Sequence, residues 1–94
     1  MKQTVISLVT PHVLTVVDLA KLSETGANVD WHVRDAVAKA YAELGHLYNA
    51  RDLISAYIEG LESTARDVGP GHRVYAGTLK SAATLAAQRL KELD

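Results

Sequence analysis

The chain has 94 residues, a formal charge of −1 and no cysteine. The length suits one domain, and the near-neutral charge argues against broad electrostatic attraction to nucleic acid or anionic lipid. Without cysteine there is no disulfide, thiol nucleophile or Cys-based zinc site. Hydrophobic residues make up 48% of the chain, enough for a core, and without Phe that core must consist of Val, Leu, Ile and Ala.

Residues 1–9 leave two conformations open. Residues 3–9 are rich in β-branched side chains, which favours a short strand or an extended arm. The same segment also fits the start of a helix, because Val5, Val9 and Val13 keep a helical spacing into the residues that follow.

Thr10 and Pro11 favour a helix that begins at Pro11, since Thr is a good N-cap and Pro is tolerated at the first helical position. We therefore predict the first helix over residues 11–24, ended by Gly26 in a left-handed conformation. The same Thr-Pro pair and Asp18 interrupt the apolar run that a signal sequence or a membrane span needs. We expect a cytoplasmic protein without a membrane partner.

Residues 30–68 have apolar side chains at every third or fourth position, which predicts a long apolar stripe on a helical face. A single helix over this stretch would be a rod of about 58 Å. Gly45 and Asn49 favour two helices instead, because Gly is a weak helix former and Asn can cap a new helix. We predict helices over residues 30–47 and 49–68, with one unbroken helix as the alternative.

The sequence Gly69-Pro70-Gly71 predicts a sharp turn, because Gly-Pro-Gly cannot continue a helix without large cost. Residues 72–77 fit either a short extended piece or the start of the last helix, which we place over residues 78–93. The apolar stripe of this helix is as narrow as a coiled-coil seam. It consists of Leu79, Ala82, Ala86, Leu90 and Leu93.

Together these elements predict one all-α domain over residues 1–94, a bundle of about four helices. We expect it to pair into a homodimer through the stripes of the third and last helices.

Catalytic and metal-binding signals are weak. Glu43 and His46 form a Glu-x-x-His pair, but carboxylate-bridged metal sites need further carboxylates and normally a second copy of that pair. No Ser lies in a Gly-x-Ser-x-Gly turn, and the glycines at residues 69–71 lack the spacing and the Lys of a phosphate loop. We expect no metal, no cofactor and no enzymatic activity.

The function that the stripes favour is a small interaction or regulatory module that binds another protein or itself. Trp31, the only Trp, fits either a cover for the end of the core or a contact with a partner. The tyrosines lie beside the main stripe, where amphipathic rings suit the rim of a core or an interface. The candidate partner-binding residues are Trp31, Tyr41, Tyr48, Tyr57, Leu79 and Leu90.

The alternative function is DNA binding through a helix-turn-helix. Residues 14–23 resemble the first helix of such motifs, and residues 30–40 would then be the recognition helix. That helix would offer His32, Arg34 and Lys39 to DNA. Three features depart from the motif: Glu24 replaces the usual Gly, the turn over residues 25–29 is longer than standard, and the reading helix carries Asp35 without a cluster of Lys and Arg.

Overall fold

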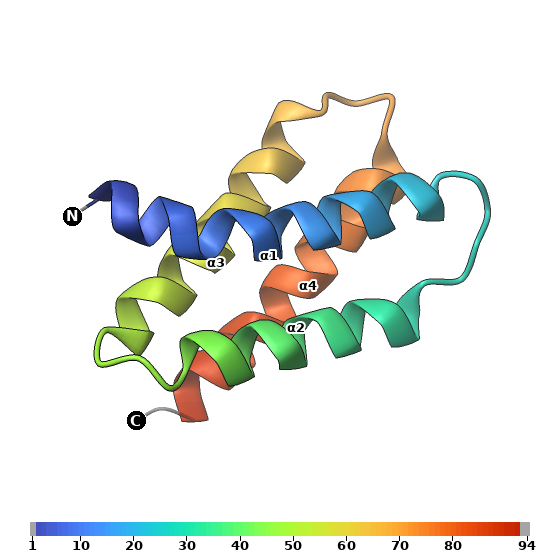
Figure 1. Cartoon of the computed structure of the whole chain (residues 1–94). Coiled ribbons are helices and arrows are strands. Elements are labelled where there is room, and N and C mark those ends of the chain that lie inside the picture. The colour runs from blue at the N-terminus through green and yellow to red at the C-terminus, as the bar shows by residue number, and fades with distance from the viewer. Residues whose placement is uncertain (1, 93–94) are drawn as a thin grey trace.

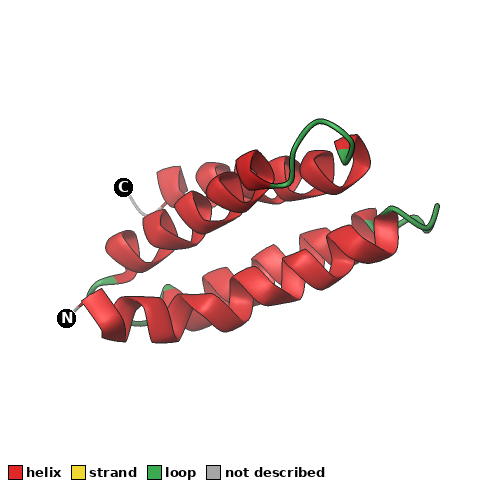
Figure 2. Cartoon of the chain, turned by 90° about the horizontal axis from the view of Figure 1, so that it is seen from above, coloured by secondary structure: helices red, strands yellow, loops and turns green. Residues whose placement is uncertain are grey.

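The computed structural model contains four α-helices in two layers, and it describes residues 2–92. The helices are α1 (Lys2–Ser23), α2 (Asp30–Leu44), α3 (Ala50–Asp67) and α4 (Arg73–Glu92). The first two run side by side as an antiparallel pair, and α3 and α4 form a second pair that crosses behind them (Figure 1). Figure 2 shows the two layers edge on. The prediction of a small all-α bundle is confirmed.

The layers meet at one core. It is built from Val, Ala, Leu and Ile with a single aromatic residue, Tyr57. Its fully buried side chains come from all four helices, for example Val16, Leu44, Leu61 and Leu79. The many alanines at the centre, where they carry no bulk beyond Cβ, allow the two layers to approach closely.

The first helix begins nine residues earlier than predicted, so the start at Pro11 is wrong, and so is the extended arm over residues 2–9; residue 1 lies outside the described residues. Pro11 lies inside α1 and is exposed, and the hydroxyl of Thr15 donates to its carbonyl oxygen at 3.0 Å. A proline inside a helix costs about 3 kcal/mol. Burial of Val9 and packing of Val5 against the core favour helix on its N-terminal side. As predicted, Gly26 follows the helix with a φ of 95°.

Residues 30–68 form two helices rather than one. The break lies where it was predicted, with Asn49 at the N-cap of α3, although its side chain makes no capping hydrogen bond. Helix α2 ends at Leu44, three residues short of the predicted end at residue 47. Gly45 is its C-cap, and the N–H of Gly45 donates to the carbonyl of Tyr41 at 2.7 Å.

The last helix begins at Arg73, five residues before the predicted start, so the open segment 72–77 is mostly helical. The preceding turn is a sharp reversal as predicted, with Gly69 at a φ of 79°. Because Gly71 is the last helix breaker before α4, nothing in the sequence delays the helix beyond it. Leu93, the last residue of the predicted stripe, lies outside the described residues.

The apolar stripes of α3 and α4 face each other and the first layer. Ile54, Leu61, Leu79 and Ala86 are at most 2% exposed. These stripes are therefore buried within one chain, and the homodimer expected to form through them stays a prediction.

Candidate interaction surface

Helix α1 is the most apolar of the four helices, and its apolar residues are spread most evenly around its axis. A helix that is hydrophobic on all sides is normally buried. Yet only one face of α1 reaches the core, through Val9, Val16 and Ala20. Of the eight large hydrophobic residues that are exposed in the described chain, four lie on α1: Ile6, Leu8, Leu14 and Leu22.

The outer side of α1 also lacks charge. From Thr4 to Val17 the sequence contains no Asp, Glu, Lys or Arg. Ile6 is 60% exposed and Leu14 is 54% exposed, and the exposed residues between them are Ser, Leu, Thr and Pro. Exposed helix faces normally carry charged side chains, so this surface resembles an interface more than a solvated face.

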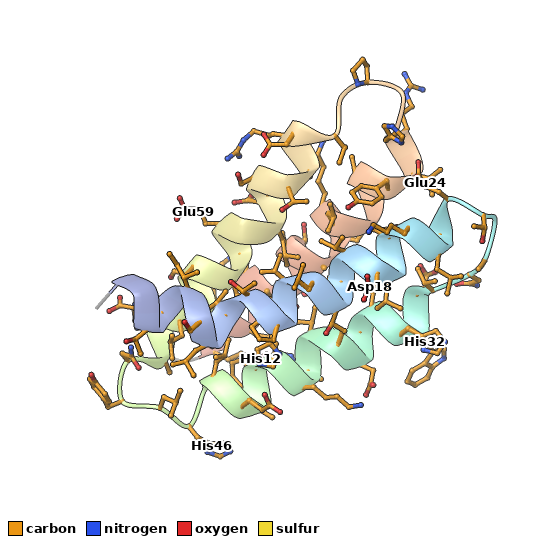
Figure 3. All side chains as sticks on the ribbon, turned by 45° about the horizontal axis from the view of Figure 1, so that its top comes forward. His12, Asp18, Glu24, His32, His46 and Glu59 are labelled. Atoms are coloured by element: carbon orange, nitrogen blue, oxygen red, sulfur yellow. The ribbon has the colours of Figure 1, made fainter. Side chains whose placement is uncertain are left out.

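A groove of about 920 Å³ opens beside this surface, between the N-terminal halves of α1 and α3. On the α1 side and at the centre of α3, the residues that line the groove are mostly apolar or small. The carboxylates of Asp52 and Glu59 lie farther out. The lining residues are Thr4, Val5, Ile6, Tyr48, Asn49, Asp52, Ala56, Glu59, Gly60 and Ser63. Figure 3 shows Glu59 on the outer side of α3.

The groove exists because α1 and α3 touch closely at one point and diverge from it toward their N-termini. At the contact, a Cβ on Gly60 would lie 3.0 Å from a methyl group of Val13. Only a residue without a side chain allows this approach at no cost. Away from the contact α3 presents Ala56, a small residue that leaves the floor of the groove low.

The inner side of α1 is fixed by a polar contact next to the core. Nε2 of His12 lies 2.9 Å from a carboxylate oxygen of Glu43 on α2, and the imidazole makes an edge contact with the ring of Tyr57, at 6.3 Å between centroids. Figure 3 shows His12 between α1 and α2. The Tyr57 side chain is 1% exposed, and its hydroxyl has no hydrogen-bond partner among the described residues. Burial raises the pKa of Tyr57 from 10.0 to about 12.

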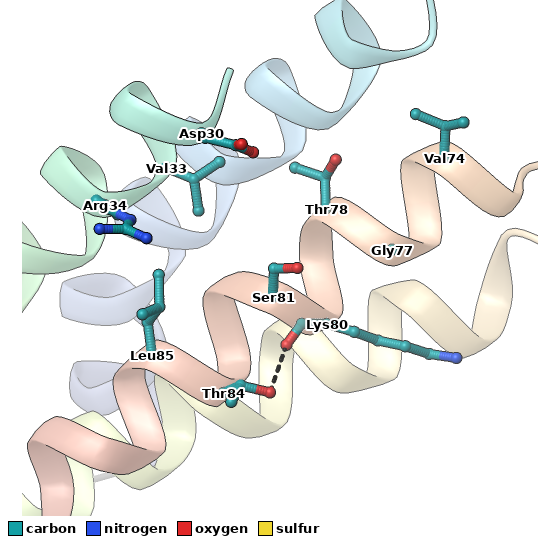
Figure 4. Close-up of a pocket in the computed structure, with 10 residues that line it drawn as sticks. All are labelled: Asp30, Val33, Arg34, Val74, Gly77, Thr78, Lys80, Ser81, Thr84 and Leu85. Atoms are coloured by element: carbon teal, nitrogen blue, oxygen red, sulfur yellow. Dashed lines mark hydrogen bonds between the residues drawn. The ribbon is translucent and has the colours of Figure 1, made fainter. Parts of the chain in front are cut away.

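The opposite side of the bundle has a different character. Between α2 and α4 lies a second groove of about 630 Å³, with the hydroxyls of Thr78, Ser81 and Thr84 along α4 and Arg34 on α2 (Figure 4). Arg34 also borders the two smaller hollows on either side of this groove. The Thr84 hydroxyl donates to the carbonyl of Lys80 at 3.0 Å. This groove combines apolar residues with hydroxyls and with charges of both signs, from Asp30, Arg34 and Lys80.

The predicted partner-binding residues separate into two groups. Tyr57 and Leu79 are buried in the core, and Leu90 packs against it. None of these three forms an exposed contact, so we reassign them to the fold. Tyr41 is half-buried, with the guanidinium of Arg89 5.5 Å from its ring centroid.

The other two predicted contacts are open to solvent. Trp31 is 82% exposed at the start of α2, away from the end of the core that it was expected to cover. Tyr48 is 98% exposed in the α2–α3 loop and lines the groove beside α1. Of the six residues, only Tyr48 belongs to this groove.

The predicted DNA-contacting residues do not form a basic surface. Nζ of Lys39 pairs with Asp35 at 3.1 Å, and Arg34 faces the α2–α4 groove rather than the outer side of α2. His32 is exposed near Trp31. Helix-turn-helix pairs cross at about 90–120°, whereas α1 and α2 run side by side (Figure 1). DNA binding stays a prediction without geometric support.

Among the residues described, no group of three or more His, Asp or Glu is placed to hold a metal ion. Nδ1 of His72 lies 2.9 Å from Glu24, and the nearby Ser23 hydroxyl donates to the carbonyl of Ala20 at 2.6 Å. The His72–Glu24 contact ties the end of α1 to the start of α4, and the Ser23 and Thr78 hydroxyls lie 3.0 Å apart across the same junction.

The exposed apolar residues of α1 were not predicted from the sequence. Ile6 and Leu8 lie outside the helix predicted over residues 11–24, and Leu14 and Leu22 lie inside it but were not recognised as an exposed apolar surface. Two signals point to them: the helical spacing of Val5, Val9 and Val13, and the absence of charge between Thr4 and Val17. Taken together, these signals describe one helix whose outer face is uncharged.

The expectation that no segment is apolar enough to span a membrane is wrong. By length and composition alone, Thr4–Ser23 of α1 is long and apolar enough to cross a bilayer. Only 17% of its most apolar stretch is buried inside the bundle. A single helix of this kind near the N-terminus is weak evidence, because signal sequences and core helices share these properties.

Comparison of the chain with protein-family models, with curated proteins and with solved structures finds no match. The features that characterise the chain are therefore its fold and its surface. It is a small four-helix bundle with an uncharged apolar face on α1 and a groove beside that face.

Proposed function

We propose that the protein is a small non-enzymatic interaction module, and that its partner covers the outer side of α1 and the α1–α3 groove. The observation that carries the proposal is that α1 is the most apolar helix and yet is mostly not buried. Within Thr4–Ser23, only 17% of the most apolar stretch is buried inside the bundle. Apolar surface left in water is unfavourable by roughly 25 cal/mol per Å². A partner on this face would remove that cost.

The shape of the surface supports the same proposal. A convex helix next to a groove offers both a ridge and a cleft, and Ile6 belongs to both. Tyr48 lies at the end of the groove with nearly its whole ring exposed. Exposed Tyr is a common anchor at protein interfaces because its ring is large and its side chain has little rotational freedom to lose.

The proposal is tested by photo-crosslinking in living cells. A photoreactive phenylalanine analogue replaces Leu14 on α1 or, as the control, Ala42, which is exposed on α2. We expect the probe at Leu14 to form covalent adducts with a defined protein, identified by mass spectrometry, and the probe at Ala42 to form none. Equal adduct patterns from the two positions, or no protein adduct from Leu14, would refute the proposal.

A further inference from the structure

We propose that the partner on α1 is a second copy of this chain, paired in antiparallel fashion so that each α1 lies along the α1–α3 groove of the other. This inference rests on the proposed function and names the occupant of the same surface. Three features carry it: a stripe on α1, an acidic edge on the groove, and a lysine at the far end of the stripe.

The stripe consists of Ile6, Thr10, Leu14, Val17 and Lys21. These residues recur every three or four positions and therefore share one side of α1. Ile6 lines the groove, so the stripe begins in the groove and runs along the helix away from it. All but Val17, which is half-buried, are exposed.

The acidic edge comes from Asp52 and Glu59 on α3. Both carboxylates line the groove and are exposed, and neither forms an ion pair with another residue of the described chain. Among the side chains that the structure describes around the groove there is no Lys or Arg. A partner that brings a positive charge to this edge would be favoured over one that brings a negative charge.

An antiparallel pair supplies that charge from the same sequence. If the two-fold axis passes between Val13 and Leu14, residue Ile6 of one chain lies opposite Lys21 of the other, and Thr10 lies opposite Val17. The aliphatic part of Lys21 would then cover Ile6, with the ammonium reaching the acidic edge. Lys21 is exposed and makes no ion pair among residues 2–92.

The centre of the α1 stripe carries no charged residue, which also fits a two-fold interface. In a two-fold interface each residue near the axis meets its own copy or a close neighbour. Charged residues there would repel, but the centre of α1 offers Thr10, Leu14 and Val17 instead. By contrast, an outer face such as that of α2, which carries Asp35 and Lys39, would bring like charges together or separate an existing ion pair.

The first test is the mass of the purified chain by size-exclusion chromatography with multi-angle light scattering. We expect about twice 10.1 kDa for the wild type and for Lys39→Glu, the control on α2. Leu14→Asp should be monomeric with an unchanged circular dichroism spectrum, because it places two carboxylates at the two-fold axis. A monomeric wild type at all concentrations, or a dimer that Leu14→Asp leaves intact, would overturn the inference.

The second test reverses charges across the interface. We expect Lys21→Glu and Glu59→Lys each to raise the dissociation constant of the dimer about tenfold, since each pair occurs twice by symmetry. The double variant Lys21→Glu/Glu59→Lys should recover the affinity. Failure of the double variant to recover it would refute the antiparallel arrangement.

A third arm separates this inference from the proposed function. The chain is sedimented with phosphatidylcholine vesicles. We expect it to stay in the supernatant as a dimer; a monomer that sediments with the vesicles would assign the α1 surface to lipid and overturn the second copy. A monomer that crosslinks from position 14 to a different protein would overturn only the dimer, whereas absence of any protein adduct would remove the proposed function itself.

Discussion

Helices α1 and α4 have similar lengths, 22 and 20 residues, yet they distribute apolar and charged residues in opposite ways. Helix α4 buries its apolar residues, with Leu79 and three alanines inside, and exposes charges such as Lys80 and Arg89. Helix α1 buries one narrow face and exposes leucines and an isoleucine, with no Asp, Glu, Lys or Arg from Thr4 to Val17.

The difference shows which helix has its apolar residues covered within one chain and which helix does not. Apart from Val74 near its start, the large apolar residues described on α4 are buried in the core or packed against it, so its outer face needs no partner. The apolar residues on the outside of α1 contribute nothing to that core. Selection for folding alone does not explain them, and this is the reason to look for the function on α1.

The largest effect expected from this comparison is a difference between two leucine deletions. Leu79→Ala on α4 should lower the free energy of unfolding by about 2–5 kcal/mol, because the side chain is fully buried. Leu14→Ala on α1 should change the free energy of unfolding of the monomer by less than about 0.5 kcal/mol, since the side chain is exposed. Urea denaturation at low protein concentration measures both. Similar costs for the two variants would mean that the two helix faces are not different.

The next effect concerns Tyr57, which lies beneath α1 against His12. Its pKa is about 12 in the folded protein and 10.0 in the unfolded chain. The unfolded state therefore loses the phenolic proton first, and stability that is fully present below pH 10 is lost as the pH rises toward 12. The full loss is about 2.7 kcal/mol, because each pKa step corresponds to about 1.36 kcal/mol.

The measurement is the free energy of unfolding from pH 8 to 12 for the wild type and for Tyr57→Phe. The variant should lack this loss, and at neutral pH it should be as stable as the wild type or more so, because it removes a buried hydroxyl without a hydrogen-bond partner in the described chain. Tyr48→Phe is the matched control, since Tyr48 is exposed and should show no such change. Identical pH profiles for the wild type and Tyr57→Phe would show that water reaches the inner face of α1.

A smaller effect tests the close contact that shapes the groove. Gly60 and Gly77 both lie inside helices, α3 and α4, where Ala is preferred over Gly by about 0.5–1 kcal/mol. A Cβ at Gly77 meets nothing within 4 Å, so Gly77→Ala should be stabilising by that amount. At Gly60 the new Cβ would press on Val13, and the gain should be cancelled or reversed.

Thermal unfolding of the two variants in parallel gives the difference, which we expect to be about 1 kcal/mol. Adding Val13→Ala to Gly60→Ala should recover part of the loss if the contact is its cause. Equal stabilisation by the two alanines would show that α1 moves away from α3 without cost.

The sequence predicted the number of helices, the break near Gly45, and the turns at Gly26 and Gly69, because these depend on local periodicity and on residues with distinct backbone preferences. It failed at the two helix starts. At Pro11 a favourable local N-terminal signal was outweighed by tertiary burial of Val9. Helix α4 begins at Arg73, soon after Gly71, and the sequence there contains no typical N-cap residue that would mark the start.

The candidate surface was harder to predict than the fold. A stripe of apolar residues does not tell whether it faces the same chain or another. The stripes of α3 and α4 look like interfaces in the sequence and are core in the structure. The groove beside Ile6 depends on how α1 crosses α3 at Gly60, which is a tertiary property that no local pattern contains.

The smallest effects concern the two polar contacts that hold α1 on its neighbours. His12 and Glu43 tie the middle of α1 to α2, and His72 and Glu24 tie its end to α4, each at 2.9 Å. In each pair one side chain is more than half exposed: His12 is 17% and Glu43 69% exposed, and His72 is 53% and Glu24 33% exposed. Water and salt therefore screen both pairs, and each should be worth between about 0 and 1 kcal/mol.

We therefore expect Glu43→Gln and Glu24→Gln each to lower the free energy of unfolding by at most about 1 kcal/mol. High salt should reduce both effects to nearly zero. Double-mutant cycles with His12→Gln and His72→Gln isolate the two coupling energies from other consequences of each substitution. A coupling energy well above about 1 kcal/mol for either pair, or one that high salt leaves unchanged, would mean that solvent does not reach that pair, so that α1 is held more tightly there than the exposed fractions of the two side chains indicate.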